Sequence, residues 1–174
     1  KTVAEADYLI SVTPPKTHNE VIFTGSIKNV AVGSLLRPEG GFAAKIANKV
    51  GIVRNNKAMI HQGLNALHKN IAHLAKRLPI NLAVIDGYSS MQGEGPSQGG
   101  ELAATEWAIA SGSALIADLT AMRLFGIDPN TVGYIKMLID EFDPKEDFIA
   151  GDNWQEHISS LKMPANFEKL KKWQ

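Results

Sequence analysis

The sequence of 174 residues contains no cysteine. Disulfides, thiolate metal sites, cysteine nucleophiles and iron–sulfur clusters held by cysteine are therefore excluded within this chain. No apolar run approaches the roughly 20 residues that a membrane-spanning helix needs, and no basic start followed by an apolar stretch suggests a signal peptide. We therefore expect no membrane partner, and a reducing, cytoplasmic location is compatible with these absences.

The chain also lacks an excess of either charge, because 18 Lys and Arg residues balance 18 Asp and Glu residues. The charge is nevertheless uneven: residues 1–57 carry eight basic and four acidic residues, whereas residues 86–156 carry three basic and thirteen acidic ones. A nucleic-acid-binding protein is expected to be basic overall or to carry a dense basic stripe, so we expect no nucleic-acid partner. The asymmetry favours a basic ligand pocket, an acidic outer surface or complementary faces.

The length predicts a single domain, 1–174, with a substantial core. Because the chain opens with Lys1 rather than methionine, we expect a processed chain or a fragment. Short apolar runs predict strands over residues 8–12, 82–85, 105–111 and 148–150. The strands at 8–12 and 82–85 are expected to be buried. Periodic apolar residues and helix caps predict helices over residues 58–78, 113–125 and 131–142, with 21–32 as a conditional helix.

Strands that alternate with helices predict an α/β fold with a layered, largely parallel sheet flanked by helices. Residues 42–57 are expected to cross the end of the sheet as a flap, and residues 167–174 to dock on the surface or on a partner rather than in the core. Asp118 falls inside the apolar helix 113–125, so it is either exposed on the far face or buried with a partner.

The stretch Pro15-Lys16-Thr17-His18, followed by Thr24-Gly25 and Lys28-Asn29, gathers cationic and hydrogen-bonding side chains within fourteen positions. Lys16 and His18 are expected in the loop after strand 8–12, where open α/β sheets bind ligands. If 21–32 is a helix, Thr24 and Lys28 share one face. We predict that Lys16, Thr17, Thr24, Lys28 and Asn29 bind an anionic group and that His18 transfers protons; the alternative is a surface loop with solvated lysines.

A second polar cluster follows the apolar run 82–85. Asp86 is expected at the end of that strand, and residues 88–100 form a loop in which five of thirteen residues are glycine or proline. Asp86 and Glu94 would suit a divalent metal ion or proton transfer, and Gly95 the close approach of a ligand. The alternative is turn chemistry with a glycine-rich connector. The loop is neither a P-loop nor a dinucleotide-binding fingerprint.

Three histidines lie on the predicted helix 58–78. His61, near its N-terminal end, could reach the end of the sheet and is a further candidate, whereas His68 and His73 are expected to be ordinary surface histidines. Because loops that follow parallel strands gather at one edge of a sheet, the candidates His18, Lys28, Asp86 and Glu94 have one place to meet.

Three ordered runs carry a resemblance to a known family: P-K-T-H with T-G-S-I-K-N, then V-I-D-G-Y-S-S-M-Q-G-E-G-P, then A-D-L-T-A-M-R-L-F-G-I-D-P. They resemble the family catalogued as domain of unknown function 362, over about residues 6–138. Members often read K-L-K-T-H where this chain has Pro14-Pro15-Lys16-Thr17-His18, so the role of the first lysine does not transfer. The resemblance implies an α/β domain, of which this chain is the C-terminal portion, in a family often found beside ferredoxin-like iron–sulfur modules and without an established activity.

From these observations we expect an anionic small-molecule ligand or cofactor at the C-terminal edge of the sheet, in a protein of redox character. The cofactor is unknown, and a divalent metal is a candidate. The alternative is a non-catalytic module that docks a ferredoxin-like partner or another electron carrier through its charged loops. A third possibility is that the motifs are structural, with the glycines and the asparagine fixing turns.

Overall fold

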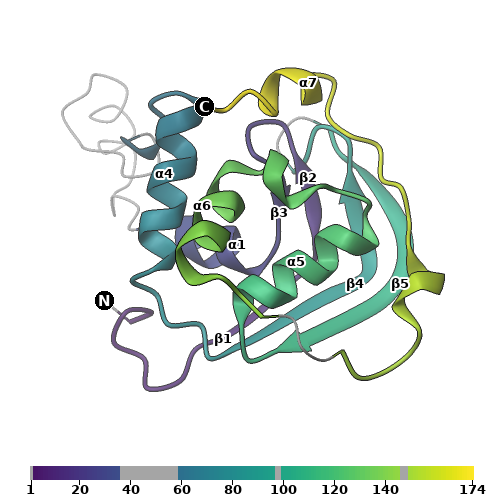
Figure 1. Ribbon diagram of the computed structural model, residues 1–174, viewed down its shortest axis with the longest axis horizontal. Coiled ribbons are helices and arrows are strands. Elements are labelled where there is room, and N and C mark those ends of the chain that lie inside the picture. Colours follow the sequence, from purple (N-terminus) through teal and green to yellow (C-terminus); the bar gives the residue numbers. More distant parts are fainter. Residues whose placement is uncertain (1, 36–58, 97–98, 146–148) are drawn as a thin grey trace, which may run out of the picture.

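The computed structural model describes residues 2–35, 59–96, 99–145 and 149–174 (Figure 1). Five strands form one mixed sheet, and the helices pack against it, so the predicted α/β class is confirmed. The strands are β1 (Ile10–Thr13), β2 (Lys16–His18), β3 (Ile22–Thr24), β4 (Leu82–Gln92) and β5 (Glu101–Ser111). The helices are α1 (Ser26–Gly33), α4 (Leu64–Ala75), α5 (Ala114–Leu124), α6 (Gly133–Phe142) and α7 (Phe167–Leu170), with short 3-10 helices η1 (Pro129–Thr131) and η2 (Trp154–His157).

Strand β4 is the centre of the sheet. Along one edge it pairs antiparallel with β5, and along the other it pairs parallel first with β1 and then, at Met91, with β2. Strands β1 and β2 are thus two parts of one extended path beside β4, interrupted by Pro14 and Pro15. Proline has no N–H for the ladder, although the carbonyl of Pro15 still accepts a hydrogen bond from Met91 N at 3.2 Å.

Two hairpins complete the sheet. Strands β2 and β3 pair antiparallel, as do the long strands β4 and β5. The β4–β5 register shifts between Gly87 and Ser89, where the partner strand carries one extra residue and Glu106 has a φ of 56°. Such a bulge bends a strand and increases its twist. Figure 1 shows β4 and β5 curving around α5, with α1 and α6 beside it.

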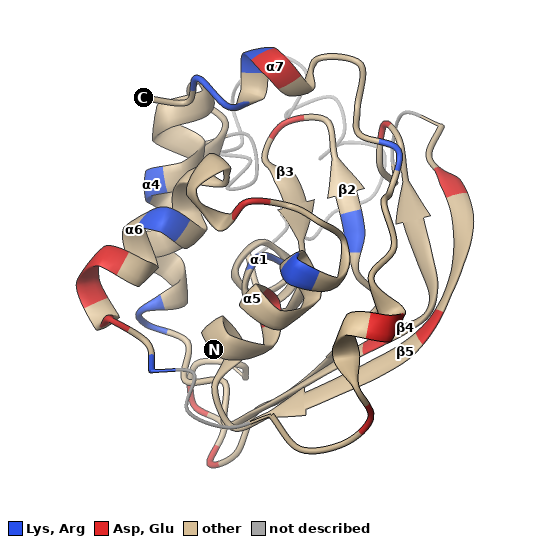
Figure 2. Cartoon of the chain, turned by 45° about the vertical axis from the view of Figure 1, so that its right-hand side comes forward, with Lys and Arg blue, Asp and Glu red and all other residues tan. Residues whose placement is uncertain are grey.

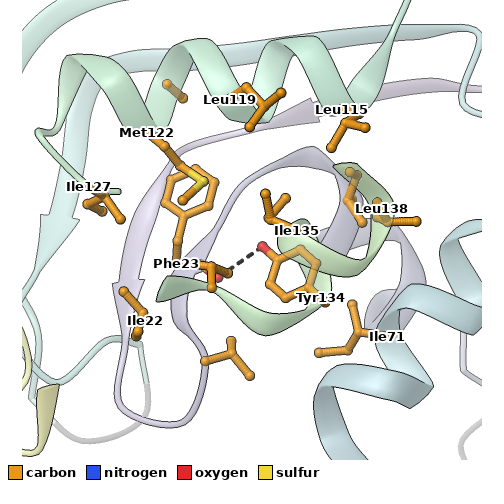
Figure 3. Packing of buried hydrophobic residues seen from close by; sticks show 14 of the residues in the cluster. Ile22, Phe23, Ile71, Leu115, Leu119, Met122, Ile127, Tyr134, Ile135 and Leu138 are labelled. Atoms are coloured by element: carbon orange, nitrogen blue, oxygen red, sulfur yellow. Dashed lines mark hydrogen bonds between the residues drawn. The ribbon is translucent and has the colours of Figure 1, made fainter. Parts of the chain in front are cut away.

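The core lies between the inner face of the sheet and the helices (Figure 3). Phe23 from β3 and Phe125 after α5 meet edge to face with ring centroids 6.4 Å apart. The side chain of Tyr134 on α6 is fully buried, and its hydroxyl donates a hydrogen bond of 3.1 Å to the carbonyl of Phe23. The core therefore joins the β2–β3 hairpin to α5 and α6.

Several predicted elements are confirmed. Residues 105–111 lie in β5, and Ser113 caps α5 by accepting a hydrogen bond from Ile116 N at 3.4 Å. The predicted helix 131–142 is present as η1 followed by α6. Asp118 follows the second of its two predicted alternatives, because it is fully buried and has partners.

The prediction for residues 8–32 was wrong in three respects. Strand β1 buries only one face, and Val12 on the other face is 65% exposed. Lys16 and His18 lie in β2 rather than in a loop. The conditional helix 21–32 is a strand, β3, followed by α1 from Ser26, because the three residues of β3 complete a hairpin before the helix begins.

The prediction that residues 82–85 form a short strand covered on both faces was also wrong. Strand β4 continues to Gln92, so Asp86 lies in mid-strand and residues 88–92 are not a loop. The burial of β4 alternates, and Asp86 and Tyr88 are exposed on the outer face. The serines and Tyr88 that suggest a loop are compatible with a strand that has one solvated face.

Other differences concern the helices and the C-terminal segment. Helix α4 is shorter than predicted, and His68 on it is fully buried rather than at the surface. Residues 149 and 150 are not in a strand. In the tail, Leu170 and Trp173 are buried and pack in the core rather than on its surface. The predicted flap 42–57 and residue 148 lie outside the described residues.

The charge distribution follows the elements. Strands β4 and β5 carry Asp and Glu but no Lys or Arg, whereas β2, α1, α4 and α6 each carry a lysine (Figure 2).

No helix among the described residues is long and apolar enough to cross a membrane.

Candidate functional site

The side chains of Lys16, His18 and Thr24 share one face of the β2–β3 hairpin. Lys16 is the register partner of Thr24, and His18 is the partner of Ile22. Side chains of directly opposed residues lie on the same face, about 5 Å apart at Cβ, and residues two apart in a strand also share a face. The hairpin therefore brings together three of the residues that the sequence suggested for ligand binding and proton transfer.

Two of these three side chains have unused hydrogen-bonding capacity. Thr24 is 2% exposed, and its hydroxyl has no hydrogen-bond partner among the residues that the structure describes. Lys16 donates one long hydrogen bond, 3.4 Å, to the carbonyl of Pro14. Burial lowers the pKa of Lys16 from its ordinary value. A partly desolvated ammonium beside an unpartnered hydroxyl favours an acceptor that carries negative charge.

His18 is held by its own turn. Its ring is 8% exposed, and Nδ1 accepts a hydrogen bond from Glu20 N at 3.1 Å. The proton of the neutral ring is therefore on Nε2. Ile22 follows with a φ of 71°, which is rare for a β-branched residue. Phe23 N donates to the carbonyl of Val21 across this residue at 2.8 Å, so the turn is tight and fixes the orientation of β3.

Lys28 and Asn29 lie in α1 rather than in the hairpin. Thr24 lies in β3 and Lys28 in α1, so the expected helical face that joins them does not exist. Lys28 is 8% exposed, and its charge contributes, after burial, to lowering the pKa of His68 on α4. Asn29 is exposed.

Thr17 and Gly95 join the hairpin to the loop after β4. The hydroxyl of Thr17 donates a hydrogen bond of 2.9 Å to the carbonyl of Gly93. Gly95 has a φ of 75°, and a Cβ at this position would lie 2.9 Å from the carbonyl oxygen of Thr17. Both conditions require glycine. The close approach expected at Gly95 is thus an approach of the protein backbone itself.

Asp118 is a central residue that the sequence analysis did not include in the site. Its carboxylate accepts hydrogen bonds from Ser26 N at 2.6 Å and from Ile27 N at 3.1 Å, at the start of α1. It thereby satisfies two of the amides that a helix leaves without partners at its N-terminus. Burial raises the pKa of Asp118 to about 7, although the two amides act in the opposite direction. The sequence signal was the acidic residue within an otherwise apolar helix, because a buried carboxyl group needs hydrogen-bond donors.

Gly25 is required by this arrangement. A Cβ at Gly25 would overlap Asp118 Oδ1 and would lie 2.9 Å from the ring of Phe23. The run T-G-S therefore contains a glycine because the carboxylate from α5 occupies the space where a side chain would be.

His68 is a second residue whose environment the sequence analysis missed. Its ring lies between Tyr134 and Trp173, and Nδ1 accepts a hydrogen bond from Tyr134 N at 3.1 Å, while Nε2 has no hydrogen-bond partner. Burial, with a smaller contribution from Lys28, lowers the pKa of His68 to about 4. The ring is neutral at pH 7. The apolar stripe beside His68 on the helix was the sequence signal for its burial. The packing of Trp173, from the C-terminal tail, against its ring could not be predicted from the sequence.

The remaining candidates have partners outside the face formed by Lys16, His18 and Thr24. Asp86 accepts a hydrogen bond from Tyr88 N at 3.1 Å, and it precedes Met91, the partner of Lys16, by five residues of strand, roughly 16 Å. Glu94 accepts a hydrogen bond from Ala165 N at 2.7 Å. His61 Nε2 lies 3.3 Å from a carboxylate oxygen of Glu20.

These positions bear on the suggested metal site. Within the described ranges, no group of three or more His, Asp or Glu side chains could hold a metal ion. The assignment of a divalent metal to Asp86 and Glu94 stays a prediction, as does the docking of a ferredoxin-like partner.

A family model described as "Domain of unknown function (DUF362)" matches residues 1–123. The chain belongs to the DUF362 family. No curated protein matches it, and no solved structure matches it.

The structure shows how the three sequence runs that resemble the DUF362 family are connected in this chain. The first run reaches the second through the hydrogen bond from Thr17 to Gly93, and it reaches the third through the two hydrogen bonds from α1 to Asp118. Part of each run therefore holds the hairpin in place. Lys16, His18 and Thr24 take no part in these connections.

Proposed function

We propose that this protein binds a small anionic ligand on the face of the β2–β3 hairpin formed by Lys16, His18 and Thr24. The observation that carries the proposal is the hydroxyl of Thr24, which is buried and unpartnered directly opposite Lys16. A hydroxyl in this position costs about 1–3 kcal/mol of stability unless an acceptor is supplied. A phosphate or carboxylate oxygen supplies that acceptor and compensates the partly desolvated ammonium of Lys16.

The surrounding structure is suited to hold these groups in place. Thr17 and Gly95 fix β2 against the loop after β4, and Asp118 fixes the start of α1 directly after Thr24. A ligand-binding group held by its neighbours loses little conformational entropy on binding. Asp118 already satisfies the amides of Ser26 and Ile27, so the helix N-terminus is not the site for the anion.

Isothermal titration with inorganic phosphate, pyrophosphate and malonate tests this proposal. Lys16→Met and Thr24→Val should each weaken binding of the best anion at least tenfold. Lys69→Met removes an exposed lysine of α4, and Thr120→Val removes a buried hydroxyl that is bound within α5. These two matched controls should bind as the unaltered protein does.

Thr24→Val has a second, independent outcome. Without ligand it should raise the melting temperature, because it removes an unpartnered polar atom while keeping the shape of the side chain. A variant that is more stable and yet fails to bind would separate a ligand-binding role from a structural one. Binding of all three anions that is equal in the variants and the controls would contradict the proposal, as would the absence of binding by the unaltered protein.

A further inference from the structure

A cavity of about 680 Å³ lies where the C-terminal ends of α4 and α6 meet the N-terminal end of α5. Its volume falls within the roughly 300–1,000 Å³ of pockets that bind small molecules. None of Lys16, His18 and Thr24 lines it. It is therefore separate from the site proposed above.

The lining of this cavity is predominantly apolar. Side chains from four helices contribute to it, including Ile27 of α1, Leu115 of α5, and Leu138 and Phe142 of α6. Phe142 is 56% exposed although it is a large apolar residue. An apolar surface of this kind favours the hydrocarbon part of a ligand, because burial of that surface removes it from water.

The charged residues of the lining are all basic. Lys76 and Arg77 belong to it, and no Asp or Glu among the described residues does. Lys76 forms an ion pair of 2.8 Å with Glu141 outside the cavity. Arg77 instead donates to Nε2 of His73, and no carboxylate of the described residues forms an ion pair with its guanidinium. The first turn of α5 carries no acidic residue either, and its helix dipole adds to the positive potential.

We propose that this cavity binds a small amphipathic molecule that has an apolar chain or ring and one anionic head group. The apolar lining takes the hydrocarbon part, and Arg77, assisted by Lys76, takes the anion. A cationic head group would meet two like charges without a compensating carboxylate in the described lining, and a neutral one would leave the guanidinium without an anionic partner. The charge of the head group therefore determines the order in which ligands with the same apolar chain bind: anionic first, then neutral, then cationic.

Titration calorimetry with three ten-carbon probes at submicellar concentration tests the inference. Decanoate should bind at least fivefold more tightly than decanol, and decanol more tightly than decyltrimethylammonium. Ala114→Phe, which places a ring into the cavity, should weaken decanoate at least tenfold. Ala104→Phe places the same ring on an exposed position of β5 outside the cavity and should leave the affinity unchanged.

Arg77→Met separates the head group from the chain. It should weaken decanoate at least fivefold and leave decanol unchanged, whereas Arg123→Met, an exposed arginine outside the cavity, should change neither. Because Arg77 is at the surface, this variant keeps the test decisive if Ala114→Phe fails to fold. Absence of decanoate binding, equal affinity for the anionic and cationic probes, or full affinity in a folded Ala114→Phe variant would each overturn the inference. Phosphate binding at Thr24 should be unaffected by Ala114→Phe, so the two proposals fail separately.

Discussion

Asp118 and His68 should give the stability of this protein two opposite dependences on pH. Burial raises the pKa of Asp118 from 3.8 to about 7, so between these values the folded state keeps a proton that the unfolded chain has lost. Burial, assisted by Lys28, lowers the pKa of His68 from 6.5 to about 4, so in that interval the unfolded chain holds a proton that the folded state lacks. The free energy of unfolding therefore falls with rising pH because of Asp118 and rises because of His68.

The sizes follow from the shifts. A difference of one pKa unit corresponds to about 1.4 kcal/mol. The shift of Asp118 thus removes about 4 kcal/mol of stability between pH 4 and 7, and that of His68 adds about 3 kcal/mol between pH 4 and 6.5. Both side chains are fully buried, so solvent does not screen these effects. The two contributions nearly cancel in the unaltered protein.

Urea denaturation at half-unit steps from about pH 4 to pH 8 measures the two contributions. In Asp118→Asn the falling contribution is absent, so the stability of this variant should increase by about 3 kcal/mol between pH 4 and 6.5, relative to any background that all variants share. In His68→Gln it should decrease by about 4 kcal/mol between pH 4 and 7. A constant difference between the unaltered protein and Asp118→Asn at every pH would refute the reasoning, because it would mean that this carboxyl group titrates alike in the folded and unfolded states.

Three further substitutions test the packing around the hairpin by the midpoint of urea denaturation. Gly25→Ala should destabilise the protein by about 3 kcal/mol or more, because the new Cβ overlaps Asp118. Gly33→Ala has open space at the end of α1 and should be neutral or stabilising. Equal midpoints for the two variants would show that the start of α1 is not tightly packed. Thr17→Val should cost about 1–2 kcal/mol, because it leaves a buried carbonyl without its donor, and an unchanged midpoint would contradict that role. Trp173→Ala should cost about 3–5 kcal/mol, and a loss below 1 kcal/mol would mean that the C-terminal segment does not pack in the core.

The sequence predicted well the elements that local patterns determine. Helix α5 was expected from the cap at Ser113 and the apolar residues after it, and the second part of β5 from the short run at residues 105–111. These signals lie within a few residues of each other, so no distant part of the chain is needed to interpret them. The α/β class follows from the same alternation of elements.

The elements that were wrong depend on distant partners. Pro14 and Pro15 correctly mark the end of a strand, but nothing local shows that the chain resumes pairing with β4 at Lys16. An apolar run such as residues 21–23 fits a strand or a helix equally well, and the pairing with β2 decides between them.

The candidate site was predicted in part for the same reason. The pattern located Lys16, His18 and Thr24, which the hairpin brings to one face, but it also included Asp86, whose strand continues past the expected end. That Asp118 needed a partner could be predicted from its apolar helix. Which amides it binds depends on the packing of α1 against α5, which the sequence alone does not specify.

The pairing of β1 and β2, at residues 10–18, with β4 has a consequence for the order in which the chain folds during synthesis. Both strands leave the ribosome before their partners in β4, at residues 82–91, and the start of α1 waits for Asp118. The β4–β5 hairpin, in contrast, closes between neighbouring segments and can form first. During synthesis β1 must therefore remain unpaired until residues 82–85 have emerged, which makes it a natural site for transient binding by a chaperone.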